Sequence, residues 1–244
     1  MLDMGLYYPI TGFYAENKSR NRQQKEFYSK FIHTSDLVFD IGANVGQRSY
    51  VFSGIAKKVV ALEPQPFCIR HLKSRFMFTK NVFIEPFAVD AVERIAVLHL
   101  SDSHTISSMS DKFINTVGST VFRNSKWDKK INVKTTTLDL LIAKHGIPSF
   151  IKIDVEGFEV NVLKGLSKSV KGISFEFLPM ATDEIRLCID RLYSVDPEYR
   201  FNYTLGENLD FILPGAVSYS EFIESILSRI AVEKSFGDIY ALRI

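Results

Sequence analysis

The chain has 244 residues, of which 46% are hydrophobic, so it is long enough to bury a substantial core in one large domain. Its 30 lysines and arginines face 28 aspartates and glutamates, and the resulting formal charge of +2 is too small to indicate general affinity for nucleic acid. The locally basic segment 123–134 can hold an anionic substrate or form a solvated loop face.

The cysteines and the hydropathy pattern predict where the protein resides. Cys68 and Cys188 are far apart in sequence and neither has a partner at metal-ligand spacing, which predicts a reduced, cytoplasmic protein. Residues 1–14 lack a basic leader followed by an apolar stretch, and no run approaches the roughly 20 apolar residues of a membrane span. We therefore expect a soluble protein.

Residues 1–35 open with an aromatic-rich segment and continue into a polar stretch, 16–31, that we expect to be helical. We interpret residues 1–35 as a cap over the functional site and residues 36–244 as the main domain. From Val38 onward, apolar runs of strand length alternate with helical patterns, which predicts a doubly wound α/β fold with a mostly parallel sheet. The expected core strands are 38–41, 59–62, 82–84, 150–153 and 173–177.

The middle region, 93–134, is less regular. It contains an expected strand at 95–100, a serine-rich loop at 101–110 and a second strand at 131–135. Insertions of this kind at strand ends often supply substrate contacts, because loops carry variable chemistry.

Towards the C-terminus the pattern changes. Two apolar runs, 199–205 and 209–213, flank Gly206-Glu207-Asn208 and predict a hairpin or a close antiparallel pair. A final helix at 219–230 precedes a terminal strand at 236–242. We therefore expect an antiparallel edge strand on an otherwise parallel sheet.

The first core strand leads into a glycine turn that is typical of cofactor sites. Gly42 and Gly46 let the backbone turn tightly into a helix. Glu63 ends the next strand, at a position where an acid commonly accepts hydrogen bonds from ribose hydroxyls. A dinucleotide motif needs glycine where this chain has Asn44, so pyrophosphate binding is disfavoured. Asp40 can pair with an ammonium or a sulfonium group, and S-adenosylmethionine carries both without phosphate. The same turn also occurs in α/β proteins that bind no ligand.

A second group of charges follows the fourth core strand. In residues 151–157, strand alternation places Lys152, Asp154 and Glu156 on one face. Burial of unpaired charge costs several kcal/mol per ion, so we expect these side chains to emerge at the carboxyl end of the strand, where doubly wound folds bind ligands. In the alternative, Asp154 caps the next helix and Lys152 only pairs with it. Glu159, expected further down that helix, has a structural role.

Glu176 is an acid inside the next apolar strand, and it either binds substrate hydroxyls close to Asp154 or forms a salt bridge to a covering helix. His99 and His104 border the serine-rich loop, and we retain His104 as a candidate substrate contact. The histidines show no metal-ligand spacing, so no metal site is assigned, although the acids can hold a divalent cation.

Six segments taken together resemble one known family. They are DIGANVG (40–46), LEP (62–64), TTTLD (135–139), KIDVEGFEVNVLKG (152–165), SFEF (174–177) and GDIYA (237–241). They resemble the FkbM family of S-adenosylmethionine-dependent methyltransferases, with a likeness that covers roughly residues 36–243.

The resemblance implies a seven-stranded, Rossmann-like class I sheet and O-methylation of a hydroxyl, often on a sugar or a secondary metabolite. It also implies a cofactor site. The residues that it assigns to the methionine end of the cofactor are Asp40, Gly42, Asn44 and Gly46. By the same likeness Glu63 holds the ribose and Asp90 lies near the adenine.

The hypothesis from the sequence is an S-adenosylmethionine-dependent O-methyltransferase that modifies a glycan or a glycosylated small molecule. Asp154 or Glu156 is expected to accept the hydroxyl proton, with Lys152 tuning the pair through its charge. Two alternatives stay open, a nicotinamide-dependent oxidoreductase and a non-catalytic module that binds S-adenosylmethionine.

Overall fold

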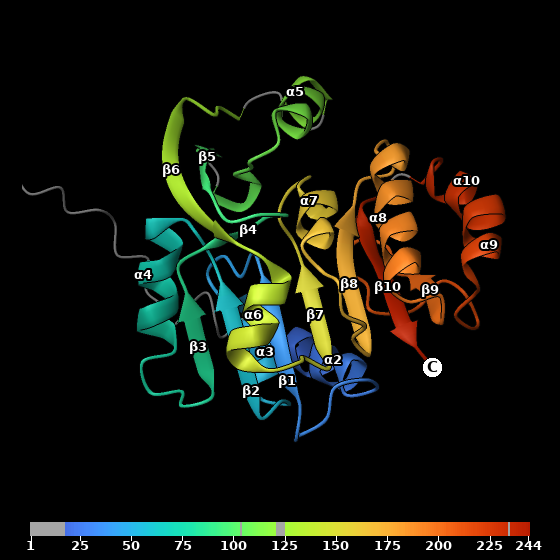
Figure 1. Cartoon of the computed structure of the whole chain (residues 1–244), viewed down its shortest axis with the longest axis horizontal. Coiled ribbons are helices and arrows are strands. Elements are labelled where there is room, and N and C mark those ends of the chain that lie inside the picture. Colours follow the sequence, from blue (N-terminus) through green and yellow to red (C-terminus); the bar gives the residue numbers. More distant parts are fainter. Residues whose placement is uncertain (1–17, 103, 121–124, 234) are drawn as a thin grey trace, which may run out of the picture.

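The computed structural model describes residues 18–102, 104–120, 125–233 and 235–244. A seven-stranded sheet runs through the molecule in the order β3-β2-β1-β7-β8-β10-β9 (Figure 1). Its strands are β1 (Leu37–Ile41), β2 (Lys58–Leu62), β3 (Val82–Glu85), β7 (Phe150–Ile153), β8 (Gly172–Phe177), β9 (Tyr199–Tyr203) and β10 (Gly237–Arg243). Neighbouring strands are parallel except where β10 pairs with β8 and β9. The predicted doubly wound, mostly parallel sheet with an antiparallel C-terminal edge is confirmed, and β10 lies one place inside the edge strand.

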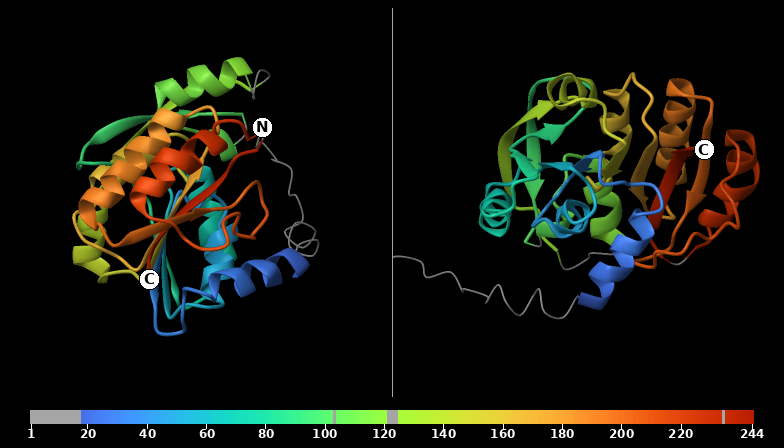
Figure 2. Two further views of the ribbon diagram at one scale, coloured as in Figure 1. Left: turned by 90° about the vertical axis from the view of Figure 1, so that its right-hand side faces the viewer. Right: turned by 90° about the horizontal axis from the view of Figure 1, so that it is seen from below.

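Helices cover both faces of this sheet (Figure 2). On one face lie α6 (Leu138–His145), α7 (Glu159–Lys164) and α8 (Thr182–Val195), which pack on strand residues such as Phe39 and Ile151. On the other face lie α2 (Lys18–Tyr28) and α3 (Gln47–Ser53), which pack on Val38 and Phe150. Because side chains alternate along a strand, every second residue counted from Val38 or Phe150 faces α2 and α3.

A smaller sheet lies above the carboxyl ends of the parallel strands (Figure 1). In spatial order it consists of β4 (Ala88–Val89), β6 (Lys129–Thr136) and β5 (Ile95–Leu100). A 3-10 turn (His104–Ile106) and α5 (Asp111–Thr120) lie between β5 and β6 in the chain. The two strands expected in this region are confirmed. The two-residue β4 is too short to leave a pattern in the sequence.

The predicted hairpin after β8 is wrong. Residues 209–213 form a loop, and the antiparallel partner of β9 is β10. The side chain of Asn202 forms the hydrogen bonds to this loop that a neighbouring strand would otherwise form. It donates to the Leu213 carbonyl (3.0 Å) and accepts from the Leu213 amide (3.1 Å). The apolar residues of the run are instead used in packing, because Phe211 contacts the rings of Phe27 and Tyr240.

The two helices predicted at 16–31 and 219–230 are close to their predicted places. The final helix is continuous from α9 (Tyr219–Glu221) through a π turn (Phe222–Ile226) to α10 (Leu227–Ile230). The helix expected at 16–31 is α2, while residues 1–17 lie outside the described part of the chain. α4 (Pro66–Arg75) follows β2 and packs Leu72 on Ala61. Within the described residues, no helix has both the length and the apolar character of a membrane span.

Candidate active site

The glycine turn between β1 and α3 brings the backbone of two strands together. Gly42, Asn44 and Gly46 have φ angles of +80°, +50° and +83°, in the left-handed region that favours glycine. A Cβ atom on Gly42 would lie 1.8 Å from the carbonyl oxygen of Asp154, which follows β7. The turn therefore depends on glycine at position 42 and adjoins the second group of charges.

Glu63, directly after β2, is hydrogen-bonded to this turn. Its carboxylate accepts hydrogen bonds from the backbone amides of Asn44 (2.9 Å) and Gln65 (2.8 Å). The residue is only 2% exposed, and burial raises the pKa of Glu63 to about 7. Such a carboxylate, rigidly held at a cavity wall, can accept hydroxyl donors from a ligand.

Asp40 lies beneath the turn on the face covered by α3. It accepts a hydrogen bond from the Ser49 hydroxyl (2.5 Å), and burial raises the pKa of Asp40 to about 6 although that hydroxyl opposes the shift. Asp40, like Glu63, borders a cavity.

That cavity has a volume of about 380 Å³ and opens at the carboxyl ends of the parallel strands. Seven of the residues predicted from the sequence line it, namely Asp40, Gly42, Asn44, Glu63, Asp154, Glu156 and Glu176. Gly46 lies behind the turn, where a Cβ atom would meet Phe76 at 2.6 Å. The cavity therefore joins the predicted cofactor residues to the predicted catalytic acids.

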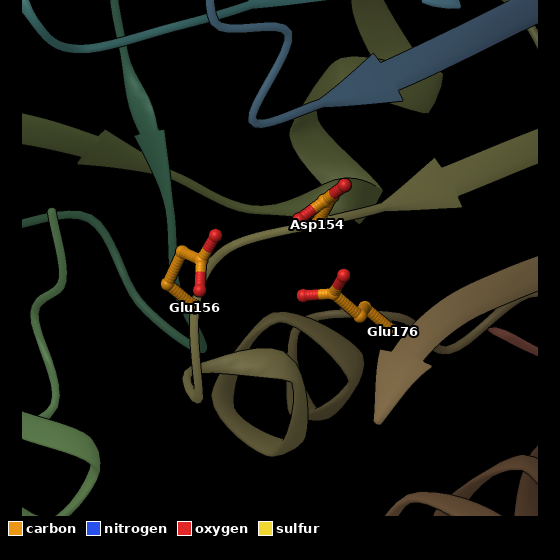
Figure 3. Close-up of side chains that lie close together, drawn as sticks. All are labelled: Asp154, Glu156 and Glu176. Atoms are coloured by element: carbon orange, nitrogen blue, oxygen red, sulfur yellow. The ribbon is translucent and has the colours of Figure 1, made fainter. Parts of the chain in front are cut away.

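Three carboxylates converge at one end of this cavity (Figure 3). Asp154 and Glu156 follow β7 and Glu176 lies near the end of β8, and their ligand oxygens all lie within 4.8 Å of one another. Burial, followed by the charge of Asp154, raises the pKa of Glu156 and of Glu176 well above the ordinary value. The raised pKa values make Glu156 and Glu176 stronger bases than ordinary carboxylates, and the oxygens of the cluster are also the ligands that a divalent cation prefers.

Lys152 does not emerge at the end of its strand as expected. It is 1% exposed inside β7, and its ammonium group donates to Asp238 (2.9 Å) and to the Ile153 carbonyl (3.2 Å). It lies 3.5 Å from Asp154, so the predicted pairing of these two residues is present. Lys152 is not among the residues lining the cavity, but its charge lowers the pKa of the lining acids Glu156 and Glu176.

The start of α7 tests two further predictions for the acidic segment. The helix begins at Glu159, so Asp154 does not cap it. The Glu159 carboxylate instead accepts from the backbone amides of Val155 (3.3 Å) and Gly157 (3.2 Å). Glu159 thus stabilises the loop that carries the acids, in the structural role expected for it but in the first turn of the helix.

The other predicted contacts lie around the cavity rather than in its wall. Asp90 is paired with Arg94 (2.7 Å) and is not among the lining residues, although Val89 is. His99 lies 3.2 Å from Asp111. His104 begins the 3-10 turn, and its side chain is outside the described part of the structure. The assignments of Asp90 to adenine and of His104 to the substrate stay predictions.

Segments expected to contact an acceptor have different positions. The serine-rich loop borders the cavity through Thr105, Ser107 and Met109, and the Ser107 hydroxyl donates to Gln65 (3.1 Å). In the basic stretch, residues 121–124 lie outside the described chain, and the described lysines there are exposed and away from the cavity. None of residues 18–35 lines the cavity, so a cap formed by residues 1–35 stays a prediction.

Sequence patterns did not single out three residues of this region. Arg48 and Glu207 line the cavity as an ion pair, and Asp238 holds Lys152. Only Asp238 left a signal, since it is an acid inside the apolar terminal strand.

The sequence profile described as the methyltransferase FkbM domain matches residues 40–203, which include both the glycine turn and the acid cluster. The chain belongs to the FkbM methyltransferase family. This family assignment confirms the resemblance drawn from the six segments.

The chain is also similar to two individual methyltransferases. The chain is 28% identical over 142 residues to the hexuronic acid methyltransferase AglP of Haloferax volcanii, in a match that covers 57% of this chain and 54% of AglP. A crystal structure of methyltransferase FkbM from Methylobacillus flagellatus KT has a TM-score of 0.54 and 15% identity, over 88% of this chain and 47% of that one. The chain thus spans about half the length of both relatives, and the solved structure shows the same fold.

The family implies S-adenosylmethionine as methyl donor, and the donors around the cavity fit this cofactor. Glu63 presents a carboxylate suited to hydroxyl groups, and Asp40 one suited to a cation. Asn44 stands where a dinucleotide-binding motif has glycine, and its side chain keeps a pyrophosphate from approaching the backbone closely. The assignment of each of these residues to a part of the cofactor stays a prediction.

Proposed function

We propose that the protein is an S-adenosylmethionine-dependent O-methyltransferase that methylates a hydroxyl of a sugar or of a glycosylated small molecule. The observation that carries this proposal is a cluster of three carboxylates in the same cavity as the glycine turn. The name of the relative AglP, a hexuronic acid methyltransferase, supports a sugar as acceptor.

Positioning is the first contribution of the chain. Bound S-adenosylmethionine supplies a methyl group on a sulfonium centre, and transfer to an alcohol requires oxygen, carbon and sulfur in line. The close contact between Gly42 and the Asp154 carbonyl places the acids directly beside the turn. An acceptor hydroxyl bound by the acids would therefore face whatever the turn holds, and closure of the cavity around it would exclude water.

Removal of the hydroxyl proton is the second contribution. We assign this role to Glu156, because it lines the cavity beside Asp154 and because burial and the charge of Asp154 raise its pKa, which makes its carboxylate a stronger base. Asp154, held by Lys152, would orient the hydroxyl, and Glu176 would accept from a neighbouring hydroxyl of the sugar. The Glu156 carboxylate would take the hydroxyl proton while the carbon–oxygen bond forms and the methyl–sulfur bond of the donor breaks, which would leave S-adenosylhomocysteine.

Binding and turnover test the proposal separately. We expect S-adenosylhomocysteine to bind the full chain in calorimetry, and S-adenosylhomocysteine to accumulate when S-adenosylmethionine is mixed with a reactive member of a glycoside panel. Glu156→Gln should lower turnover by roughly 100-fold or more and leave the affinity for S-adenosylhomocysteine within a few-fold. Glu224→Gln, an exposed position in the final helix, is the matched control and should change neither value.

Three results would contradict the proposal. A folded protein that does not bind S-adenosylhomocysteine would exclude the cofactor. Binding without turnover on any glycoside would favour a non-catalytic binding module. A change in NADH fluorescence on mixing would favour the oxidoreductase alternative.

A further inference from the structure

An ion pair that the proposed chemistry does not use lies in the wall of the same cavity. The Arg48 guanidinium, from the first turn of α3, donates to the Glu207 carboxylate at 3.2 Å. Arg20, from α2, pairs with the same carboxylate. Both Arg48 and Glu207 line the cavity, so a ligand there would meet an arginine whose partner is already a carboxylate.

The two partners are held to different degrees. Arg48 is the less exposed partner, since its side chain is 21% exposed and its guanidinium also lies within the electrostatic range of the Asp238 carboxylate. Glu207 is 52% exposed and belongs to the turn after β9 rather than to a helix or strand. Arg48 is therefore the fixed group and Glu207 the one that can move.

Glu207 is ionised in this position. Burial alone would raise the pKa of Glu207, but Arg48 and Arg20 outweigh it and lower the pKa. If Glu207 left Arg48, its carboxylate would still be paired, because Arg20 remains as a partner. Exchange of one carboxylate for another on Arg48 is thus nearly balanced in charge, which makes it easier than the creation of a new ion pair.

We infer that Arg48 is a binding site for a ligand carboxylate, and that Glu207 occupies this site until the ligand displaces it. The inference rests on the proposed function, because it takes the cavity to hold the donor and the acceptor. A guanidinium binds a carboxylate through two parallel hydrogen bonds, and it distinguishes an acid from the corresponding neutral molecule. The carboxylate can come from the methionine part of the donor or from an acidic sugar acceptor.

Calorimetry with matched ligands separates these two sources. S-adenosylmethionine is compared with its decarboxylated form, and methyl glucuronide is compared with methyl glucoside in the presence of S-adenosylhomocysteine. If the donor supplies the carboxylate, Arg48→Gln weakens binding of S-adenosylmethionine by roughly 10- to 100-fold and leaves the decarboxylated form unchanged. If the acceptor supplies it, both donor forms bind as before and the preference for glucuronide over glucoside disappears.

Glu207→Gln tests displacement itself. Loss of the competing charge should strengthen binding of the carboxylate ligand severalfold, whereas a residue that merely positions Arg48 would weaken it on removal. Arg22→Gln, in the exposed pair with Glu26 on α2, is the control and should have no effect. Arg48→Lys keeps the charge and loses the paired hydrogen bonds, so it replaces Arg48→Gln if that variant does not fold.

The inference is overturned if Arg48→Gln or Arg48→Lys leaves the carboxylate dependence of both ligand pairs unchanged, or if Glu207→Gln weakens binding as much as the arginine variants. Failure of the proposed function is distinct, because the wild-type chain would then bind neither S-adenosylmethionine nor S-adenosylhomocysteine.

Discussion

Asp238→Asn should destabilise the protein more than any other single change of charge near the site. Lys152 is 1% exposed and donates to Asp238 at 2.9 Å, so the substitution leaves a buried ammonium group without its nearest anion. Loss of one partner from a buried pair typically costs about 3–5 kcal/mol. Lys152 keeps Asp154 at 3.5 Å and the Ile153 carbonyl, and we therefore expect the lower end of the range, about 3 kcal/mol.

Urea unfolding followed by circular dichroism measures this loss, with the slope of the transition as a check that unfolding remains two-state. Asp154→Asn is the matched control. Its side chain is 35% exposed, so solvent screens its longer contact with Lys152 and the expected loss of stability is below about 1 kcal/mol. In turnover the order should be reversed: Asp154→Asn should lower turnover more than Asp238→Asn does, because only Asp154 lines the cavity.

A double variant completes the test. Lys152→Met together with Asp238→Leu removes both charges, and replacement of a buried ion pair by apolar side chains is often neutral or stabilising. The reasoning is refuted if Asp238→Asn costs less than about 1 kcal/mol, or if the double variant is as unstable as the single one.

Four further outcomes are expected. Glu63→Ala should weaken binding of S-adenosylhomocysteine by about 1.5–3 kcal/mol in calorimetry, and an unchanged affinity would show that Glu63 does not hold the ligand. Because the pKa of Glu63 is about 7, that affinity should rise with pH through neutrality as the carboxylate ionises, and Glu63→Gln should remove the dependence. Gly42→Ala should destabilise the fold by roughly 2–4 kcal/mol in urea, since its Cβ atom would meet the Asp154 carbonyl. The pKa of Asp40 is raised from 3.8 to about 6, so the folded state binds the extra proton between these values, and stability should fall there as pH rises. The same titration of Asp40→Asn should be flatter over that interval.

The sheet and the glycine turn between β1 and α3 were predictable because their signals are local. Gly42, Gly46 and the acid after the next strand, Glu63, all lie within one short stretch of the chain. The structure contains the strand, turn, helix and strand in the order that this stretch predicts. The methyltransferase family assignment agrees with this part of the sequence. The predicted binding roles of the single residues stay open to the experiments above.

Predictions that required the partner of a strand were less successful. The run 209–213 has the apolar content of a strand, but β10 already occupies the open edge of β9 and Asn202 takes up the backbone groups of Leu213. Lys152 was expected to leave the sheet because its local sequence offers no buried anion besides Asp154. Its main partner, Asp238, lies 86 positions further along the chain.

The face of the sheet towards α2 and α3 explains how these distant residues form one site. On this face each central strand changes from apolar or neutral to charged as it approaches the cavity. The pairs are Val38 and Asp40 in β1, Phe150 and Lys152 in β7, Ser174 and Glu176 in β8, and Tyr240 and Asp238 in the reversed strand β10. Asp40 and Lys152 lie opposite each other in β1 and β7, whereas Glu176 and Asp238 lie opposite each other one step further towards the cavity in β8 and β10. The charges therefore gather at one edge of the sheet, and the single buried lysine among them offsets part of the mutual repulsion of the acids. The reversal of β10 is essential to this arrangement, because it brings an acid near the start of the last strand to the level at which the parallel strands end.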